Sequence, residues 1–445
     1  MISRRVRAQA GLTALSWLII IALVVILAGG AYYYAQRPRQ ATQPQRLGGS
    51  VSVVGVWGGS ELESFLAMVK PFEDATGVKV EFEGTRDINA VLTTRVQGGN
   101  PPDVAGLPGP GQMAEFARAG KLVALDDVLD LAAMKEQYAP SWIDLASVDG
   151  KVYGVFIKAA LKGLIWYSPK AFKAAGYEVP TTWDGLLQLT ERIKTDGKTP
   201  WCIGLESAAA SGWPATDWIE DIVLRAAGPD AYDRWYRHEI PWTDAAVRNA
   251  WEQFGKIAAA PNVYGGTQAV LATNFGEAPF PLFTDPPGCY LHHQATFIQD
   301  FIQKQYPNLK AGQDFDFFAF PPIDPNVPKA VEAGGDLFGM FKDTPQARAL
   351  MKYLTTSEAQ TIWVKRGGAL SANRKVGLDD YPDPLARRAA EILTSADVVR
   401  FDASDLMPEA VNSAFWKGTL DYVQSPNRLD EILQTIERTA QESYK

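Results

Sequence analysis

The sequence contains few residues of the kinds that form disulfide frameworks or metal sites. Its 445 residues include two cysteines and three histidines. Two cysteines exclude a small scaffold held together by several disulfide bonds. The histidines, His238, His292 and His293, lack the helical i,i+4 spacing of a zinc site, so we expect no metal.

The common catalytic motifs are also missing. The chain has no G-x-S-x-G motif, no Walker A motif, no G-x-G-x-x-G motif and no calcium loop of the EF-hand type. These absences give no sign of a cofactor, but a Ser-His-Asp arrangement stays open, because its members meet only in space. A surface-anchored enzyme acting on glycosides stays open as an alternative, because 51 acidic residues always offer a carboxylate pair.

Basic residues are scarce outside the N-terminus. Six arginines precede Gly49, so the rest of the chain carries 37 basic residues against 51 acidic ones, a net charge of −14. An acidic body repels phosphates, so we expect no nucleic-acid partner. The hydrophobic content of 47% excludes a disordered chain, and the length suits two or three lobes, each with its own core.

The N-terminus holds the one long apolar run. Residues 12–31 carry no charge and follow three arginines. At about 1.5 Å per residue the run is long enough to cross a bilayer. Residues 1–35 are therefore either a signal peptide, cleaved after Ala31, or a membrane anchor with Trp17 at one interface. Residues 36–49 are rich in proline, glutamine and arginine and predict a flexible tether. We expect the body to lie outside the cytoplasmic membrane, in the periplasm or on the outer membrane face.

Cys202 and Cys289 suit that compartment. An oxidising environment permits a disulfide bond, and two lone cysteines in an exported body often pair. A bond across 87 positions contributes at most roughly 4–5 kcal/mol on the chain-entropy model. We predict this bond; two buried free thiols are the alternative.

The hydrophobic pattern of the body indicates an α/β fold. Residues 50–57 predict a buried strand, 61–75 an amphipathic helix and 78–82 a second strand. A helix over 88–96 and a strand over 103–107 repeat the order, so we expect parallel strands with helices on both faces. Two such lobes fit the length, with a ligand in the cleft between them and closure about a hinge.

Several segments, in this order, resemble the extracellular solute-binding proteins of ABC sugar importers. SGWPATDWIEDIVLR and DPPGCYLHHQA are most similar to the alpha-glucoside-binding subgroup. The resemblance covers almost 90% of the chain, from residue 50 onward, and also rests on WGGSELESF, TGVKVEFEG, GGNPPDVAGLPGPG, GKLVALDD, DGKVYGV, GLIWYSPKAFKAAGYEVPTTWDGL, AGGDLFGMF and MPEAVNSAFW.

The resemblance implies a two-lobed, periplasmic-binding-protein-like fold with a hinge and an inter-lobe cleft. The N-lobe would comprise 50–159 and 322–355, and the C-lobe 160–321 and 356–445. Such a protein has no catalytic residues; it closes on a small carbohydrate and delivers it to ABC permease subunits in the membrane. We expect a monomer and an alpha-glucoside such as maltose, trehalose or sucrose, with glucosylglycerol-type solutes as the alternative. A sensor or adhesin lobe without transport also stays open.

The candidate ligand-binding residues combine flat aromatic rings with charged hydrogen-bonding groups, the two features that a sugar ring requires. Each also has a structural interpretation: tryptophans are more often core residues, Arg86 and Asp87 fit a solvated turn after 78–82, and Asp217 fits a helix N-terminus. The resemblance places the loop containing Gly334 in the cleft and matches Trp416 to a stacking tryptophan of maltose-binding relatives. The nine candidates are Trp57, Ser60, Arg86, Asp87, Trp213, Asp217, Gly335, Asp336 and Trp416.

Three further residues are weaker candidates. Lys158 and Lys162 lie near the expected crossing between lobes, where a solvated face is the favoured interpretation. Tyr290 follows Cys289 and is a further candidate for the cleft.

Overall fold

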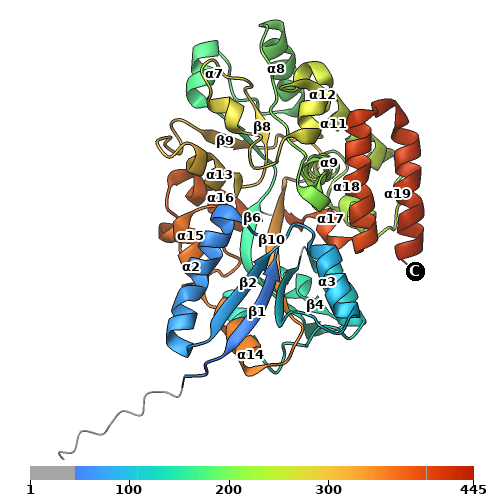
Figure 1. Cartoon of the computed structure of the whole chain (residues 1–445). Helices are drawn as coiled ribbons and strands as arrows, with labels where there is room; N and C mark the ends of the chain where they lie inside the picture. Colours follow the sequence, from blue (N-terminus) through green and yellow to red (C-terminus); the bar gives the residue numbers. More distant parts are fainter. Residues whose placement is uncertain (1–45, 108, 397, 445) are drawn as a thin grey trace, which may run out of the picture. The chain divides into compact units, whose positions relative to one another are not determined.

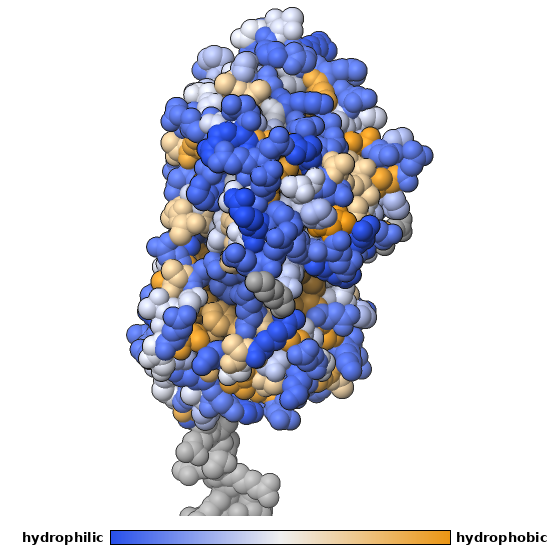
Figure 2. Space-filling model, turned by 90° about the vertical axis from the view of Figure 1, so that its right-hand side faces the viewer, coloured by the Kyte–Doolittle hydropathy of each residue, from blue (hydrophilic) through white to orange (hydrophobic). Residues whose placement is uncertain are grey.

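The computed structural model describes residues 46–107, 109–396 and 398–444, of which Leu47 onward forms one compact unit. The expected signal peptide or anchor and most of the expected tether lie outside the described residues. Across the described ranges, every helix is too short or too polar to cross a membrane. The face of the molecule in Figure 2 is largely hydrophilic, with hydrophobic side chains scattered over it.

A six-stranded sheet forms the lower part of the molecule in Figure 1. Strands β1 (Ser50–Gly55), β2 (Lys79–Gly84) and β3 (Val104–Leu107) are parallel, with β1 in the middle. The long strand β10 (Ala330–Met340) runs antiparallel to β3 and to β6 (Gly154–Leu161), and parallel to β11 (Val398–Phe401). The predicted α/β fold and its first three parallel strands are confirmed.

The connecting helices follow from the sequence pattern. Helix α2 (Gly59–Thr76) buries Phe65, Met68, Val69 and Phe72 on one face, and it ends at Gly77, whose φ of 72° favours glycine. The other elements of this half are α3 (Ile88–Gln97), α4 (Pro110–Arg118), α5 (Leu131–Gln137), α6 (Pro140–Leu145), β4 (Ser147–Val148), β5 (Lys151–Val152) and α14 (Pro345–Leu354).

A small antiparallel sheet, β8 (His292–His293), β7 (Leu164–Tyr167) and β9 (Asp316–Ala319), lies in the upper part of Figure 1. Helices surround it and pack through a second hydrophobic cluster. They are α7 (Pro169–Ala175), α8 (Trp183–Thr195), α9 (Trp213–Ala226), α10 (Pro229–Tyr236), α11 (Ala245–Ala258), α12 (Gly266–Ala272), α17 (Ala403–Leu406), α18 (Glu409–Gln424) and α19 (Leu429–Ser443). Helix α13 (Ile298–Gln305) instead packs with the first cluster, through Ile298 and Ile302.

The buried hydrophobic side chains of the described residues form two clusters. The first surrounds the six-stranded sheet; the second lies among the upper helices. Helices α15 (Ser357–Arg366) and α16 (Pro384–Ser395) pack with the first cluster, whereas Ala403 and the helices after it belong to the second. Within the range 356–445, which the sequence analysis assigned to one lobe, the packing therefore changes cluster between Phe401 and Ala403.

Most tryptophans are buried in the core. Seven of them are among the largest fully buried side chains: Trp166, Trp201, Trp218, Trp235, Trp242, Trp251 and Trp363. The predicted disulfide bond is present: Cys202 and Cys289, with Cα atoms 5.6 Å apart, join the segment before α9 to the irregular segment before β8.

Candidate ligand-binding site

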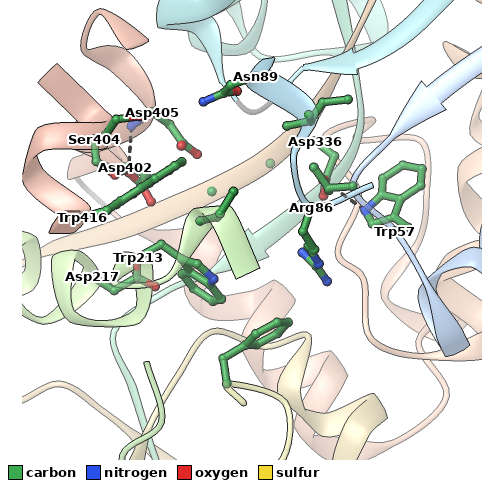
Figure 3. A pocket seen from close by; sticks show the side chains of 18 of the residues that line it. Trp57, Arg86, Asn89, Trp213, Asp217, Asp336, Asp402, Ser404, Asp405 and Trp416 are labelled. Carbon is green, nitrogen blue, oxygen red and sulfur yellow. Dashed lines mark hydrogen bonds between the residues drawn. The ribbon is translucent and has the colours of Figure 1, made fainter. Parts of the chain in front are cut away.

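A cavity of about 490 Å³ opens between the carboxyl-end turns of the six-stranded sheet and the helices of the second cluster. From the sheet side come the turn after β1, the turn after β2 and the middle of β10; from the other side come the N-termini of α9, α17 and α18. Its size is that of a small-molecule site. Figure 3 shows Trp57, Arg86 and Asp336 on one side and Trp213, Asp217 and Trp416 on the other.

The structure brings together eight of the nine predicted site residues. Trp57, Arg86, Asp87, Trp213, Asp217, Gly335, Asp336 and Trp416 all line this cavity. Ser60 does not; it lies in the first turn of α2, and its hydroxyl faces the carboxyl group of Asp300.

One ionic network, which we call the Lys158 network, lies on the sheet side of the cavity. Lys158 Nζ lies 2.6 Å from Glu61 Oε1 and 3.5 Å from Asp336 Oδ2. Arg86 Nη2 lies 3.5 Å from Glu61 Oε2, and Trp57 Nε1 donates to Asp336 Oδ1 at 3.2 Å. Two cations therefore face two carboxylates.

The partners in the Lys158 network favour the charged forms of Glu61 and Lys158, whereas at Asp336 burial outweighs Lys158 and raises the pKa of the carboxyl group. Burial favours the neutral form of Glu61, but Lys158 and Arg86 outweigh it and lower the pKa of this carboxyl group. Burial likewise opposes the charge of Lys158, yet Glu61 and Asp336 raise the pKa of its ammonium group. At neutral pH both are charged.

A second group, which we call the Lys162 network, lies on the opposite wall. Lys162 Nζ donates to Asp217 Oδ1 at 2.8 Å and forms a short ion pair with Asp402. Asp402 Oδ1 also accepts from Ser404 Oγ at 2.7 Å and from the backbone N–H of Asp405 at 3.0 Å. Burial opposes both charges, but Lys162 lowers the pKa of Asp402, and Asp217 with Asp402 holds the pKa of Lys162 well above its usual range.

The aromatic residues differ in how they can serve a ligand. Trp213 and Trp416 are partly exposed at the cavity, and the ring of Trp213 packs edge-on against Phe275 with centroids 5.1 Å apart. Trp57 is only 3% exposed, and Phe338 stacks on it at 5.4 Å. The ring of Trp57 is thus packed in the core, and its polar contribution is the hydrogen bond to Asp336.

The sequence analysis misplaced three weaker candidates. Lys158 and Lys162, interpreted as a solvated face, are 3% and 8% exposed and lie at the centres of the two networks, because buried carboxylates surround them. Tyr290, a candidate for the cleft, instead packs edge-on against Tyr177 and is not among the cavity-lining residues.

Several other lining residues were not predicted from the sequence. Glu61, Phe275, Phe297, Asp402, Ser404 and Glu409 all reach the cavity. Glu61 directly follows the Gly58–Ser60 turn and could have been found from that position. Phe275 and Phe297 sit in irregular segments with no periodicity, so only the fold brings them to the site.

The arrangement suits binding of a neutral, hydroxyl-rich molecule. Two partly exposed indole rings offer flat apolar faces, and carboxylates, amides and cations offer charge-assisted hydrogen bonds. None of the described lining residues is a histidine or cysteine. His292 and His293 are buried elsewhere, and burial lowers the pKa of His292 to about 4, so that its imidazole is neutral.

Comparison with known proteins finds relatives that match most of this chain. Residues 58–361 match the family described as bacterial extracellular solute-binding protein. The osmoprotective compounds-binding protein GgtB of Synechocystis sp. is 44% identical over 391 residues, 87% of this chain and 92% of that protein. The alpha-glucosides-binding periplasmic protein AglE of Rhizobium meliloti is 41% identical over 395 residues, 86% of this chain and 85% of that protein.

Solved structures share the fold at low sequence identity. The bacterial solute receptor AcbH superposes with a TM-score of 0.78 at 21% identity, covering 89% of this chain and all of that one. Maltose-bound MalE3 of T. maritima superposes with a TM-score of 0.70 at 16% identity, covering 88% and 99%.

The chain therefore belongs to the bacterial extracellular solute-binding proteins. As a member of this family it is the solute-binding component of an ABC importer, and it is not an enzyme. The predicted family and the absence of catalysis are thus confirmed.

Proposed function

We propose that the protein captures a small alpha-glucoside in this cavity and delivers it to a membrane permease. The observation that carries the proposal is the meeting of Trp213 and Trp416 with the two ionic networks around one cavity of about 490 Å³. The names of the two relatives above 40% identity support it, since one binds alpha-glucosides and the other osmoprotective compounds.

The eight predicted residues that line the cavity have different roles in binding. Trp213 and Trp416 stack on sugar faces, while Arg86, Asp87, Asp217 and Asp336 bind hydroxyl groups. Gly335 lets β10 pack closely against β6, because a Cβ there would meet the Lys158 carbonyl oxygen at 2.9 Å and the Phe156 ring at 3.0 Å. Trp57 acts as a positioning residue through Asp336.

Two lobes, each carrying one wall of the cavity, close on the ligand. The ligand contacts both walls only when they approach, so it stabilises the closed state. We place the lobe boundaries as the sequence predicts for 50–159, 160–321 and 322–355, and we assign 356–401 to the first lobe on its packing. Residues 1–35 export or anchor this body, which acts as a monomer.

Disaccharides such as maltose, trehalose and sucrose are the first candidate ligands. Glucosylglycerol-type solutes are the second, and the similarity to GgtB favours them. Thermal melting of the full-length protein against each compound distinguishes the two classes. A ligand at 100 times its dissociation constant adds about 2.7 kcal/mol of stability, which raises the melting temperature visibly. Flat melting curves for every glucoside would refute the proposal.

A further inference from the structure

A cluster of carboxyl groups lies at and behind the second wall of the cavity. Asp217 and Glu220 come from α9, Glu332 from β10 and Asp402 from the turn after β11; one oxygen of each lies within 4.8 Å of the others. All four side chains are at most 2% exposed. We call them the carboxyl cluster. Figure 3 shows Asp217 and Asp402 where the cluster reaches the cavity.

The charges around this cluster do not balance. Asp221 on α9 adds a fifth buried carboxylate, which pairs with Arg225 and accepts from His293 Nε2 at 2.7 Å. Five carboxylates against two cations would leave a net charge of −3 in the interior, at a prohibitive cost. The groups that face the cluster are Lys162 after β6, Asp221 and Arg225 on α9, Tyr232 on α10, His293 on β8 and Asp405 on α17.

The carboxyl group of Glu332 lies in the cluster without a hydrogen-bond partner among the described residues. It is fully buried, and neither carboxylate oxygen has a hydrogen-bond donor among the described residues. Glu220 Oε2 and Asp217 Oδ2 also have no partner there. An ionised carboxylate in this position would bury a charge without compensation, whereas a protonated carboxyl group supplies its own donor.

A metal ion fits the cluster less well than protons do. The Lys162 ammonium group already lies between Asp217 and Asp402, where a cation would bind. The remaining free oxygens are those of Glu332, Glu220 and Asp217.

We propose that the carboxyl cluster is a proton-binding site, in which Glu332 and Glu220 are neutral acids at neutral pH and Asp217 exchanges its proton with the surroundings. Burial, with the charges of Asp221 and Glu220, holds the pKa of Glu332 well above its usual range. Burial and the charge of Asp402 do the same for the pKa of Glu220. Burial raises the pKa of Asp217 to about 7, although Lys162 opposes it.

The direction of the pH effect follows from these raised values. The folded protein holds protons that the unfolded chain releases above about pH 4, so stability falls as pH rises from there through the folded pKa values. Each such proton changes the folding equilibrium by up to about tenfold per pH unit. A second effect rests on the proposed function: ligand affinity also depends on pH, because Asp217 lines the cavity.

Thermal melting of the full-length protein and of E332Q, from pH 5 to pH 9, tests the proposal without a ligand. Glutamine has the shape of a protonated glutamate and cannot ionise. We expect E332Q to melt within about 1 °C of the wild type at pH 5 and to become progressively more stable than the wild type as pH rises. E220Q should behave in the same way. The exposed Glu178 provides the matched control, since E178Q should give a pH-independent difference.

Two results would overturn the proposal. A melting temperature of E332Q that stays below the wild type by the same margin at every pH would mean that Glu332 is ionised. A rise in melting temperature with calcium chloride in the wild type, absent in E332Q, would mean that a metal balances the charge. Sugar affinity, measured separately across the same pH range, reports only on the coupling to the cavity.

Discussion

The two lysines that line the cavity have opposite surroundings. Lys158 and Arg86 face Glu61 and Asp336, so that sheet-side charges cancel. Lys162 faces Asp217 and Asp402 and has Glu220 and Glu332 behind them, an excess of carboxyl groups. The first network is a set of fixed charges suited to orienting a ligand. The second needs protons to be stable, so its charge depends on pH.

The largest expected effect comes from removing the cation of the crowded network. K162M leaves Asp217 and Asp402 buried without a cation and should reduce the free energy of unfolding by about 3–5 kcal/mol. K158M should cost less, because Arg86 remains 3.5 Å from Glu61. Urea denaturation of both variants measures the difference. Lys170, paired with Asp314 but 76% exposed, is the control; K170M should cost under about 1 kcal/mol. Equal losses for K158M and K162M would mean that the two surroundings are energetically alike.

The two networks should also fail at opposite ends of the pH scale. The lowered pKa of Glu61 contributes stability that is present above its ordinary value of about 4.5 and is lost as pH falls below it. In E61Q this contribution is absent. We therefore expect E61Q to be less stable than the wild type at pH 7, with the difference shrinking toward pH 3. Urea denaturation at several pH values measures it, and a difference independent of pH would contradict a charged Glu61.

Aromatic residues on the two walls should affect binding to different extents. W416A removes a partly exposed ring and should weaken glucoside binding by about 1–3 kcal/mol, as should W213A. W57F keeps an aromatic ring in the core but loses the hydrogen bond to Asp336 and part of the indole packing, so its effect on affinity should be smaller, about 1 kcal/mol. Titration calorimetry measures all three. A larger loss of affinity in W57F than in W416A would contradict the roles assigned to these two side chains.

The smallest expected effect belongs to Asp87. It lines the cavity but is solvent-exposed at the start of α3, so D87A should weaken binding by about 1 kcal/mol. The same titrations check it, with E83A as a control on the exposed β2 edge outside the cavity. Unchanged affinity in D87A would remove Asp87 from the site.

The sequence predicted the fold where local pattern and tertiary structure agree. The alternation in 50–57 and 78–82 and the apolar face of 61–75 are local features, and they became β1, β2 and α2. Residues in turns after strands, such as Arg86, were found because such turns meet at one sheet edge. Trp416 and Gly335 were found through resemblance, although the expected loop at Gly335 was wrong, since Gly335 lies within strand β10.

What the sequence could not predict is charge compensation across long separations. Lys158 and Lys162 look like solvated lysines until Glu61 and Asp402, 97 and 240 positions away, are placed beside them. Local pattern also could not show that 356–401 stays in the first cluster together with α14, because the apolar face of a helix does not specify which core it contacts.

Titration calorimetry of maltose, trehalose, sucrose and glucosylglycerol, against the wild type and W416A, tests the central claim most directly. The account predicts that at least one of these glucosides binds the wild type, is recovered chemically unchanged, and binds W416A about 5- to 150-fold more weakly, the equivalent of about 1–3 kcal/mol. Failure of all four to bind, or equal affinity for both proteins, would contradict the assignment of this cavity to alpha-glucosides.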